Sequence, residues 1–154
     1  MLERKLPEES NTLALGAALA IAMPADVPRA LRIELRGELG AGKTTLVRGF
    51  LRACGIVGVV RSPSYALLEI YEFEGRRALH LDLYRLRDPT EVAGLGLRDY
   101  DEPGTVWLVE WPERAAGALP APDLVIELVG QLDGHHGKLT SGSPEGLRWI
   151  RSIE

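Results

Sequence analysis

The 154-residue sequence predicts an α/β fold, in which helices flank a mostly parallel sheet. Segments of strand-like apolar patterning alternate along the chain with segments of helical periodicity, which is the order that α/β folds require. A glycine-rich turn joins one of these strands directly to a helix, as in the connections of parallel sheets. A chain of this length can bury one sizeable core, so we expect residues 1–154 to form a single domain.

The first half of the chain contains two predicted helices around one predicted strand. Residues 10–22 start with cap-forming side chains and continue with apolar residues at helical spacing, which predicts a helix. Residues 30–37, ALRIELRG, alternate apolar and charged side chains. This alternation predicts a strand with one buried face and argues against helix layers on both sides of the sheet. A second helix is expected over residues 44–54, because Gly55 is a typical helix terminator.

The second half adds further strands, predicted at 65–73, 77–86, 105–111 and 123–142. The turn sequence EGR separates the first two strands, and the last segment contains a turn around residue 133. Residues 105–111, TVWLVEW, form a compact apolar run of the kind that a parallel sheet buries. A short helix and a loop are expected over residues 89–104.

The composition excludes several classes of protein. A single cysteine, Cys54, excludes an internal disulfide framework and a cluster of thiolate metal ligands. No apolar run reaches membrane-spanning length, and residues 1–10 lack the basic start and apolar core of a signal peptide. We therefore expect a cytoplasmic protein without a membrane partner. The net charge of −4, with most of the acidic excess after residue 90, argues against a protein that binds RNA by electrostatics alone.

A phosphate-binding loop is predicted between the strand at 30–37 and the helix at 44–54. Residues 37–44, GELGAGKT, match G-x-x-x-x-G-K-[ST] in the strand-to-helix context that this motif needs. The glycines let backbone N–H groups point at phosphate oxygens, Lys43 would reach the outer phosphates, and the Thr44 hydroxyl would bind magnesium. An ordinary glycine turn before a helix is the alternative. The loop residues expected to bind the nucleotide are Gly37, Leu39, Gly40, Ala41, Gly42, Lys43 and Thr44.

The lysine at position 43 favours the phosphate-binding interpretation. Only three of the 18 basic residues are lysines, so a merely solvated cation in this chain would more often be an arginine. A compact ammonium also fits a phosphate cradle better than a planar guanidinium does. This bias favours a nucleotide site over an ordinary turn.

Two acidic residues are candidates for the magnesium site and for catalysis. Phosphoryl chemistry on magnesium requires an acid near the loop, usually at the carboxyl end of a neighbouring strand. Glu110 closes the apolar run VWLVE, and Asp82 follows the strand-like segment RALHL. A solvated acid at a strand end is the alternative for each. We keep both acids, so the predicted catalytic residues are Lys43, Asp82 and Glu110, and the predicted metal ligands are Thr44, Asp82 and Glu110.

Other side chains near these motifs have no role that spacing fixes. We expect His80 to be a packed or strand-exposed histidine rather than a general base, and Arg85 to be an ion-pair partner rather than an arginine finger. Trp107 is expected in the core, whereas Trp111 is a candidate surface contact or lid over the nucleotide. The histidines 135–136 lack ligand spacing, which argues against a metal site there.

Five segments occur in a fixed order along the chain: GELGAGKTT (37–45), SPSY (62–65), HLDLYRL (80–86), LGLRDY (95–100) and VEWPER (109–114). Together they resemble the TsaE family, the small bacterial ATPases of tRNA threonylcarbamoyladenosine synthesis. The resemblance extends from about Thr12 to Arg114, and few phosphate-loop proteins combine these motifs. It implies a P-loop NTPase fold that binds ATP with Mg²⁺.

The resemblance also implies partner proteins. Family members work with TsaB and TsaD, which transfer a threonylcarbamoyl group to adenosine 37 of tRNAs that read codons beginning with adenine. A TsaE protein would use ATP to sustain turnover of that complex. The transfer chemistry would belong to the partners, and tRNA would be met only through the complex.

Several residues match family positions. These positions are Lys43, Thr44 and Thr45 in the phosphate loop, Asp82 as a switch-like acid, Glu110 as the magnesium-associated acid, and Thr12 as a first-helix threonine near the base. The usual SPTF segment of the family is SPSY here, so Ser64 replaces a threonine. Serine keeps the hydroxyl but lacks the β-methyl group that restricts its orientation.

Two other functions remain open from the sequence. A small-molecule kinase uses the same loop, but 154 residues leave little room for both an arginine-bearing lid and an acceptor pocket. A GTP-dependent switch is disfavoured, because no N-K-x-D segment for reading guanine occurs in the chain. We expect an ATPase that is slow alone and stimulated by its partners.

Overall fold

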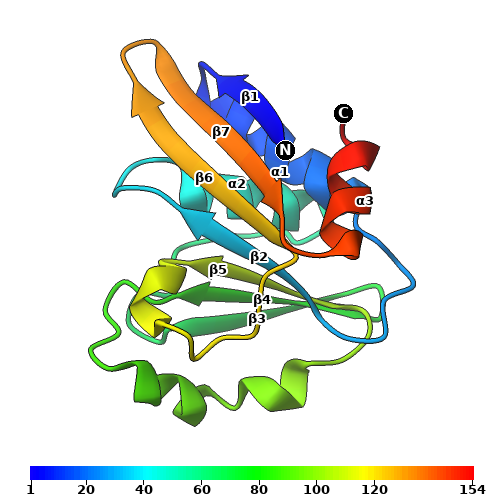
Figure 1. Ribbon diagram of the computed structural model, residues 1–154, viewed down its shortest axis with the longest axis vertical. Helices are drawn as coiled ribbons and strands as arrows, with labels where there is room; N and C mark the ends of the chain where they lie inside the picture. The colour runs from blue at the N-terminus through cyan, green and yellow to red at the C-terminus, as the bar shows by residue number, and fades with distance from the viewer.

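Seven strands and six helices make up the computed structural model, which describes residues 1–154 (Figure 1). The strands are β1 (Leu2–Leu6), β2 (Leu31–Arg36), β3 (Leu68–Phe73), β4 (Arg76–Asp82), β5 (Thr105–Glu110), β6 (Leu124–Gln131) and β7 (Gly134–Ser141). The α-helices are α1 (Glu9–Ile21), α2 (Lys43–Ala53) and α3 (Pro144–Ser152), and the 3₁₀ helices are η1 (Pro89–Leu95), η2 (Leu97–Tyr100) and η3 (Pro112–Ala115). The predicted helices at 10–22 and 44–54 correspond to α1 and α2.

The strands form one mixed sheet with the order β1-β7-β6-β2-β5-β4-β3. Its centre is parallel, because β2 pairs in parallel with β5 and β6, and β4 pairs in parallel with β5. The hairpins β3–β4 and β6–β7 are antiparallel, as is the pairing of β1 with β7. The predicted α/β fold is confirmed, and the parallel arrangement holds for the four central strands β6, β2, β5 and β4.

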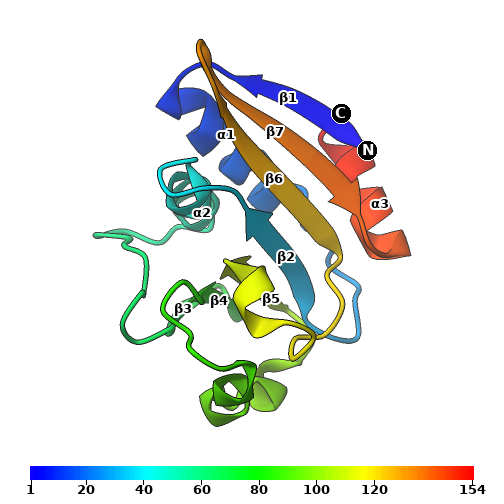
Figure 2. The same ribbon diagram turned by 60° about the vertical axis from the view of Figure 1, so that its left-hand side comes forward.

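Different layers cover the two faces of the sheet. Helices α1 and α2 pack closely on one face, seen behind the strands in Figure 1. The packing is tight because Gly16 of α1 lies against the backbone of Leu46, and Gly49 of α2 lies against the backbone of Leu13. The 3₁₀ helices η1 and η3 pack on the other face, where they cover buried side chains of β4 and β5 (Figure 2).

The prediction of one buried face for β2 was wrong. All residues from Leu31 to Leu35 are buried, including the charged Arg32 and Glu34. The guanidinium of Arg32 lies 4.9 Å from the ring of the buried Trp107 and forms an ion pair with Asp101 at 2.8 Å. Because 3₁₀ turns and paired charges cover the second face, a fully covered central strand here does not need an apolar sequence on both sides.

Three elements have no counterpart in the sequence-based prediction: β1, η3 and α3. Strand β1 at the edge of the sheet has the sequence LERKL, in which Glu3 and Lys5 are exposed, whereas Arg4 is half-buried and donates to the carbonyl of Ile153 at 2.8 Å. Helix α3 begins after Ser143, whose hydroxyl accepts the N–H of Gly146 at 3.0 Å. The indole of Trp149 in α3 donates to the carbonyl of Leu19 at 2.8 Å and joins α3 to α1. The segment 89–104 contains the two short helices η1 and η2 rather than one.

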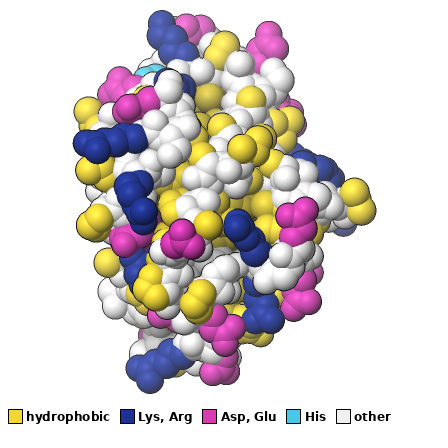
Figure 3. Space-filling view, turned by 90° about the vertical axis from the view of Figure 1, so that its right-hand side faces the viewer, with side chains coloured by type: hydrophobic (Ala, Val, Ile, Leu, Met, Phe, Trp, Pro, Cys, Tyr) yellow, Lys and Arg dark blue, Asp and Glu magenta, His cyan; other side chains and the backbone are white.

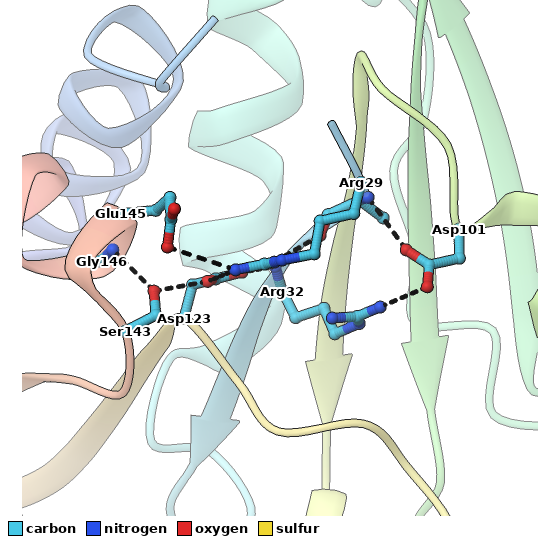
Figure 4. Close-up of polar contacts among 8 residues, drawn as sticks. Arg29, Arg32, Asp101, Asp123, Ser143, Glu145 and Gly146 are labelled. Atoms are coloured by element: carbon cyan, nitrogen blue, oxygen red, sulfur yellow. Dashed lines mark hydrogen bonds and ion pairs between the residues drawn. The ribbon is translucent and has the colours of Figure 1, made fainter. Parts of the chain in front are cut away.

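At the amino end of β2, ion pairs join segments from distant parts of the chain (Figure 4). The buried carboxylate of Asp123 accepts hydrogen bonds from the Arg29 guanidinium at 2.8 and 3.0 Å, the Arg32 backbone at 2.9 Å and the Ser143 hydroxyl at 2.6 Å. Burial opposes ionisation of Asp123, but these donors outweigh it, so the pKa of Asp123 is lowered. The network therefore fastens α3 and the last hairpin to the central strand.

The face nearest α3 carries acidic and basic side chains that are interspersed around hydrophobic ones (Figure 3).

No helix in the structure combines the length and apolar composition needed to cross a bilayer.

Candidate active site

The loop between β2 and α2 lies at the carboxyl end of the central strand. Its three glycines have positive φ angles, which are 149° at Gly37, 78° at Gly40 and 101° at Gly42. Gly37 also lies so close to the carbonyl of Leu128 that a Cβ atom would collide with it. Helix α2 begins directly after Gly42, so its first N–H groups face the end of the loop without partners inside the helix.

Lys43 turns back across this loop. Its Nζ atom donates to the carbonyls of Gly37 and Glu38, the second at 2.9 Å, and lies 4.2 Å from the centre of the Trp111 ring. Burial lowers the pKa of Lys43, while the nearby carboxylates, Glu110 first among them, oppose this shift. The ammonium is thus held over the loop by carbonyls and a ring, which are weaker partners than phosphate oxygens.

Glu110 and Thr44 meet at the start of α2. Glu110 ends β5 and is 2% exposed. The Thr44 hydroxyl lies 3.0 Å from Oε1 and 3.1 Å from Oε2 of Glu110, and Nε2 of His80 lies 2.5 Å from Oε2. A hydroxyl and a carboxylate are the hard oxygen ligands that magnesium prefers.

Asp82 stands beside Glu110 but has other partners. The two acids face each other in the register of β4 and β5. The Ser62 hydroxyl donates to Oδ2 of Asp82, and the backbone N–H of Tyr84 donates to Oδ1 at 2.9 Å. Burial raises the pKa of Asp82 and the charge of Glu110 adds to the rise, against the hydrogen bond from Tyr84. Asp82 therefore links the end of β4 to the SPSY segment.

These groups surround an open cavity of about 420 Å³. The residues that line it are Leu39, Gly40, Ala41, Gly42, Lys43, Thr44, Thr45, Ser62, Ser64, Asp82, Tyr84, Arg85, Glu110 and Trp111. Of the predicted site residues, only Gly37 and Thr12 lie outside this lining. Gly37 forms the base of the loop, and the buried Thr12 packs from α1 against Gly42.

Comparisons with known proteins agree with the motifs. The family model for the threonylcarbamoyl adenosine biosynthesis protein TsaE matches residues 6–137. The chain belongs to the TsaE family. It is 41% identical over 128 residues to the tRNA threonylcarbamoyladenosine biosynthesis protein TsaE of Haemophilus influenzae, with 82% of this chain and 81% of that protein covered. The protein of the same name from Bacillus subtilis is 38% identical over 120 residues, covering 78% and 71% of the two chains.

A solved structure has the same architecture. The crystal structure of Bacillus subtilis YdiB superposes with a TM-score of 0.79 at 25% sequence identity, over 99% of this chain and 93% of that one. The resemblance to TsaE that the sequence motifs predicted is confirmed, and the α/β fold of this chain is that of the TsaE family.

The residues of this TsaE chain fit a magnesium–nucleotide ligand. The loop offers positive-φ glycines and the N-terminal end of an 11-residue helix, which together favour phosphate. Lys43 supplies a cation, and the adjacent Thr44 and Glu110 supply oxygen ligands. The donor set is therefore suited to a hard cation bound together with phosphates.

Several cavity residues were missed or placed differently by sequence reasoning. Arg85 forms no ion pair, and instead stacks 4.3 Å from the Tyr65 ring, whose hydroxyl it contacts at 3.3 Å. Tyr84 packs against Trp111 with 4.9 Å between ring centroids. Ser62 was visible only as the first letter of SPSY, and Tyr84 only as part of HLDLYRL. Trp107 is in the core, as predicted.

Proposed function

We propose that this TsaE protein is a magnesium-dependent ATP hydrolase that drives a tRNA-modifying complex. The contact between Thr44 and Glu110, at 3.0 and 3.1 Å beside the phosphate loop, carries this proposal. A hydroxyl from the start of α2 and an acid from the end of β5 meet there, where a magnesium ion bound to nucleotide phosphates would find both ligands. The proposed nucleotide-binding residues are the predicted ones, Thr12, Gly37 and Leu39–Thr45.

Different groups of the chain would bind the phosphates, stabilise the developing charge and hold the metal ion. Backbone N–H groups of the loop and of α2 bind and orient the phosphates. Lys43 leaves the carbonyls of Gly37 and Glu38 for the more strongly charged phosphate oxygens, so its ammonium stabilises charge that develops during transfer. Bound magnesium would neutralise phosphate charge. Thr44 and Glu110 would hold this ion.

We assign Asp82 to a different role from Glu110. Glu110 contacts the Thr44 hydroxyl at the start of α2, whereas the partners of Asp82 are the Ser62 hydroxyl and the backbone of Tyr84. Asp82 would therefore couple the SPSY segment to the nucleotide site, in the manner of a switch. We therefore propose Glu110, rather than Asp82, as the acid that would hold magnesium.

The proposed partners are TsaB- and TsaD-like proteins in the cytoplasm, with tRNA contacted only through their complex. Relatives at 41% and 38% identity are named as tRNA threonylcarbamoyladenosine biosynthesis proteins, which supports this pathway for the chain. The net charge of −4, and the mixed charges on the face nearest α3, support an indirect rather than a direct contact with tRNA (Figure 3). ATP hydrolysis would then supply conformational work to the partner complex.

Phosphate release tests the proposal. We expect slow, magnesium-dependent ATP hydrolysis by the chain alone and acceleration by an active TsaB–TsaD complex. Competition by GTP at equal affinity would favour a nucleotide switch of broader specificity. ADP formation that requires a small-molecule acceptor would favour the kinase alternative. Absence of ATP hydrolysis in every condition would reject the proposal.

A further inference from the structure

His80 is fully buried, yet its one side-chain hydrogen bond goes to the site. It lies on β4 between Leu79 and Leu81, and all three residues have no exposed surface. Its Nε2 atom is 2.5 Å from Oε2 of Glu110, while its Nδ1 atom is buried without any partner. An aliphatic side chain could fill this position without leaving a polar atom unsatisfied, so packing alone does not account for the imidazole.

An ionised Glu110, as a magnesium ligand would be, determines which ring nitrogen of His80 donates. A carboxylate can only accept hydrogen bonds, so this contact then requires a proton on Nε2 of His80. Nδ1 contacts nothing that would hold the ring in another orientation. The ring is therefore oriented by Glu110 and by its apolar surroundings.

The carboxylate of Glu110 is held from two sides. His80 holds Oε2, and the Thr44 hydroxyl approaches both oxygens, at 3.0 and 3.1 Å. Oε1 therefore has Thr44 as its single neighbour among the hydrogen-bonded groups. Without the His80 contact, a 2% exposed glutamate side chain would keep its burial but lose one of the two contacts that define its orientation.

We propose that His80 is a positioning residue, whose Nε2–H fixes the Glu110 carboxylate beside Thr44 and thereby strengthens magnesium binding. The inference rests on the proposed function, in which Glu110 and Thr44 hold that ion. His80 acts only through Glu110, because no side chain other than Glu110 is within hydrogen-bond distance of it. Groups that orient a metal ligand in this way typically change metal affinity or activity by about 10–100-fold when removed.

A pair of amide substitutions separates positioning from packing. In His80→Gln the amide nitrogen stands as many bonds from the backbone as Nε2 of histidine, so it can still donate to Glu110. In His80→Asn the amide nitrogen matches Nδ1 instead and cannot reach. His136→Asn is the matched control, because His136 lies on β7 and contacts Glu3 at 3.7 Å, far along the chain from the site.

The measurement is magnesium affinity, titrated in the presence of saturating ATP and followed both by nucleotide binding and by phosphate release. We expect His80→Asn to need about 10–100-fold more magnesium, His80→Gln to remain within a few-fold of the parent protein, and ATP binding in EDTA to be unchanged in both. Equal magnesium requirements in His80→Asn and the parent protein would overturn the inference. Equal losses of magnesium affinity in His80→Asn and His80→Gln would also overturn the inference.

Nitrogen-15 NMR of the histidine rings gives a readout that does not depend on activity. We expect a proton on Nε2 of His80 in the ligand-free protein, with the resonance assigned by its absence in His80→Gln. A ring protonated only on Nδ1 would overturn the inference. If the parent protein itself shows no magnesium-dependent ATP binding, the proposed function fails, and this result differs from a normal parent with an insensitive His80→Asn variant.

Discussion

The two ends of the central strands each bury an aspartate, and the two aspartates differ in how they are satisfied. Asp123, at the amino end, accepts hydrogen bonds from Arg29, Ser143 and the Arg32 backbone, and its pKa is lowered (Figure 4). Asp82, at the carboxyl end, has no cationic partner in contact, and burial and Glu110 raise its pKa. One end of the sheet is therefore built for stability, while the other keeps charge that a ligand can compensate.

The same contrast holds for the basic residues. Arg29 forms ion pairs with Asp123 at 2.8 Å and with Glu145 at 3.3 Å, which raise its pKa. Lys43 contacts carbonyls and a ring, and burial lowers its pKa. The cation at the amino end therefore has two carboxylate partners, whereas the cation at the carboxyl end has none in contact, as expected where a ligand supplies the negative charge.

Removal of Lys43 should produce the largest effect at the carboxyl end. We expect Lys43→Ala to hydrolyse ATP about 1,000-fold more slowly, because the variant lacks the cation that meets charge developing on the phosphates. Its free energy of unfolding should change by less than about 1 kcal/mol, because the lost bonds are to carbonyls near water. Phosphate release and urea denaturation check both statements. Near-normal hydrolysis by the folded variant would contradict the phosphate-loop assignment.

Removal of Asp123 should have the opposite effect to removal of Lys43: a large loss of stability and little change in ATP binding. We expect Asp123→Ala to lower the free energy of unfolding by about 3 kcal/mol, because Arg29 and the Arg32 backbone lose a buried charged acceptor. ATP binding by the folded fraction should be unchanged. Glu145→Gln is the matched control, since its half-exposed ion pair with Arg29 should contribute less than about 1 kcal/mol. If the free energy of unfolding fell no further in Asp123→Ala than in Glu145→Gln, the amino end of the sheet would not have the stabilising role assigned to it.

Substitution of the two site acids should affect catalysis before binding. We expect Asp82→Ala and Glu110→Ala to hydrolyse ATP about 100-fold more slowly, while ATP affinity changes by less than about tenfold, because the loop supplies most phosphate contacts. Only Glu110→Ala should raise the magnesium requirement strongly. Parent rates in both variants at saturating magnesium would remove both acids from the site.

The sequence predicted the parts of this structure that depend on local patterns. The loop at 37–44, the helix after it and the paired strands around EGR follow from glycine placement and periodicity, and the structure has them. The prediction that β2 has one exposed face was wrong, because the residues that cover the Arg32 side chain, Asp101 and Trp107, lie far along the chain. Helix α3 was missed because a segment of nine residues is short for a periodicity signal and its stability depends on Trp149 and Asp123 contacts.

Prediction of the candidate site was limited in the same way. Spacing placed Lys43 and Thr44 together, because they adjoin in one loop. The proposed choice of Glu110 over Asp82 depends on its contact with Thr44, which joins residues 66 positions apart, and the contact from Ser62 to Asp82 joins residues 20 positions apart. His80 could not be assigned a role, because strand alternation gives its face but not its hydrogen-bond partner.

A smaller effect is expected from Trp111, which packs on Tyr84 at 4.9 Å and under Lys43 at 4.2 Å. Trp111→Ala should still bind ATP and should lose about tenfold in stimulation by a TsaB–TsaD complex, as expected for an aromatic interface anchor. Phosphate release with and without the complex, alongside ATP affinity, checks this. Full stimulation of the variant would reject the role given to this side chain and leave the partner-driven mechanism in place.

The smallest effects should appear in the pH dependence of stability. The pKa of Asp123 is lowered, so its contribution is present above the ordinary aspartate value and is lost as the pH falls through the folded value. The pKa of Asp82 is raised, so its contribution is present below the ordinary value and is lost as the pH rises through the folded value.

Isosteric variants test these opposite signs. Relative to the parent protein, Asp123→Asn should be less stable at neutral pH, with a difference that shrinks below about pH 4, whereas Asp82→Asn should be more stable at neutral pH, with a gain that disappears below about pH 4. Urea midpoints at several pH values check this. Identical pH profiles for the two variants would remove the contrast between the two ends of the sheet.

Steady-state phosphate release from ATP is the most direct test that the carboxyl end of the sheet is a catalytic site. We predict slow release by the parent protein that requires magnesium, rises on addition of an active TsaB–TsaD complex, and disappears in Lys43→Ala but persists in Glu145→Gln. Release that is independent of magnesium, or equal in the parent protein and Lys43→Ala, would contradict the assignment of this site.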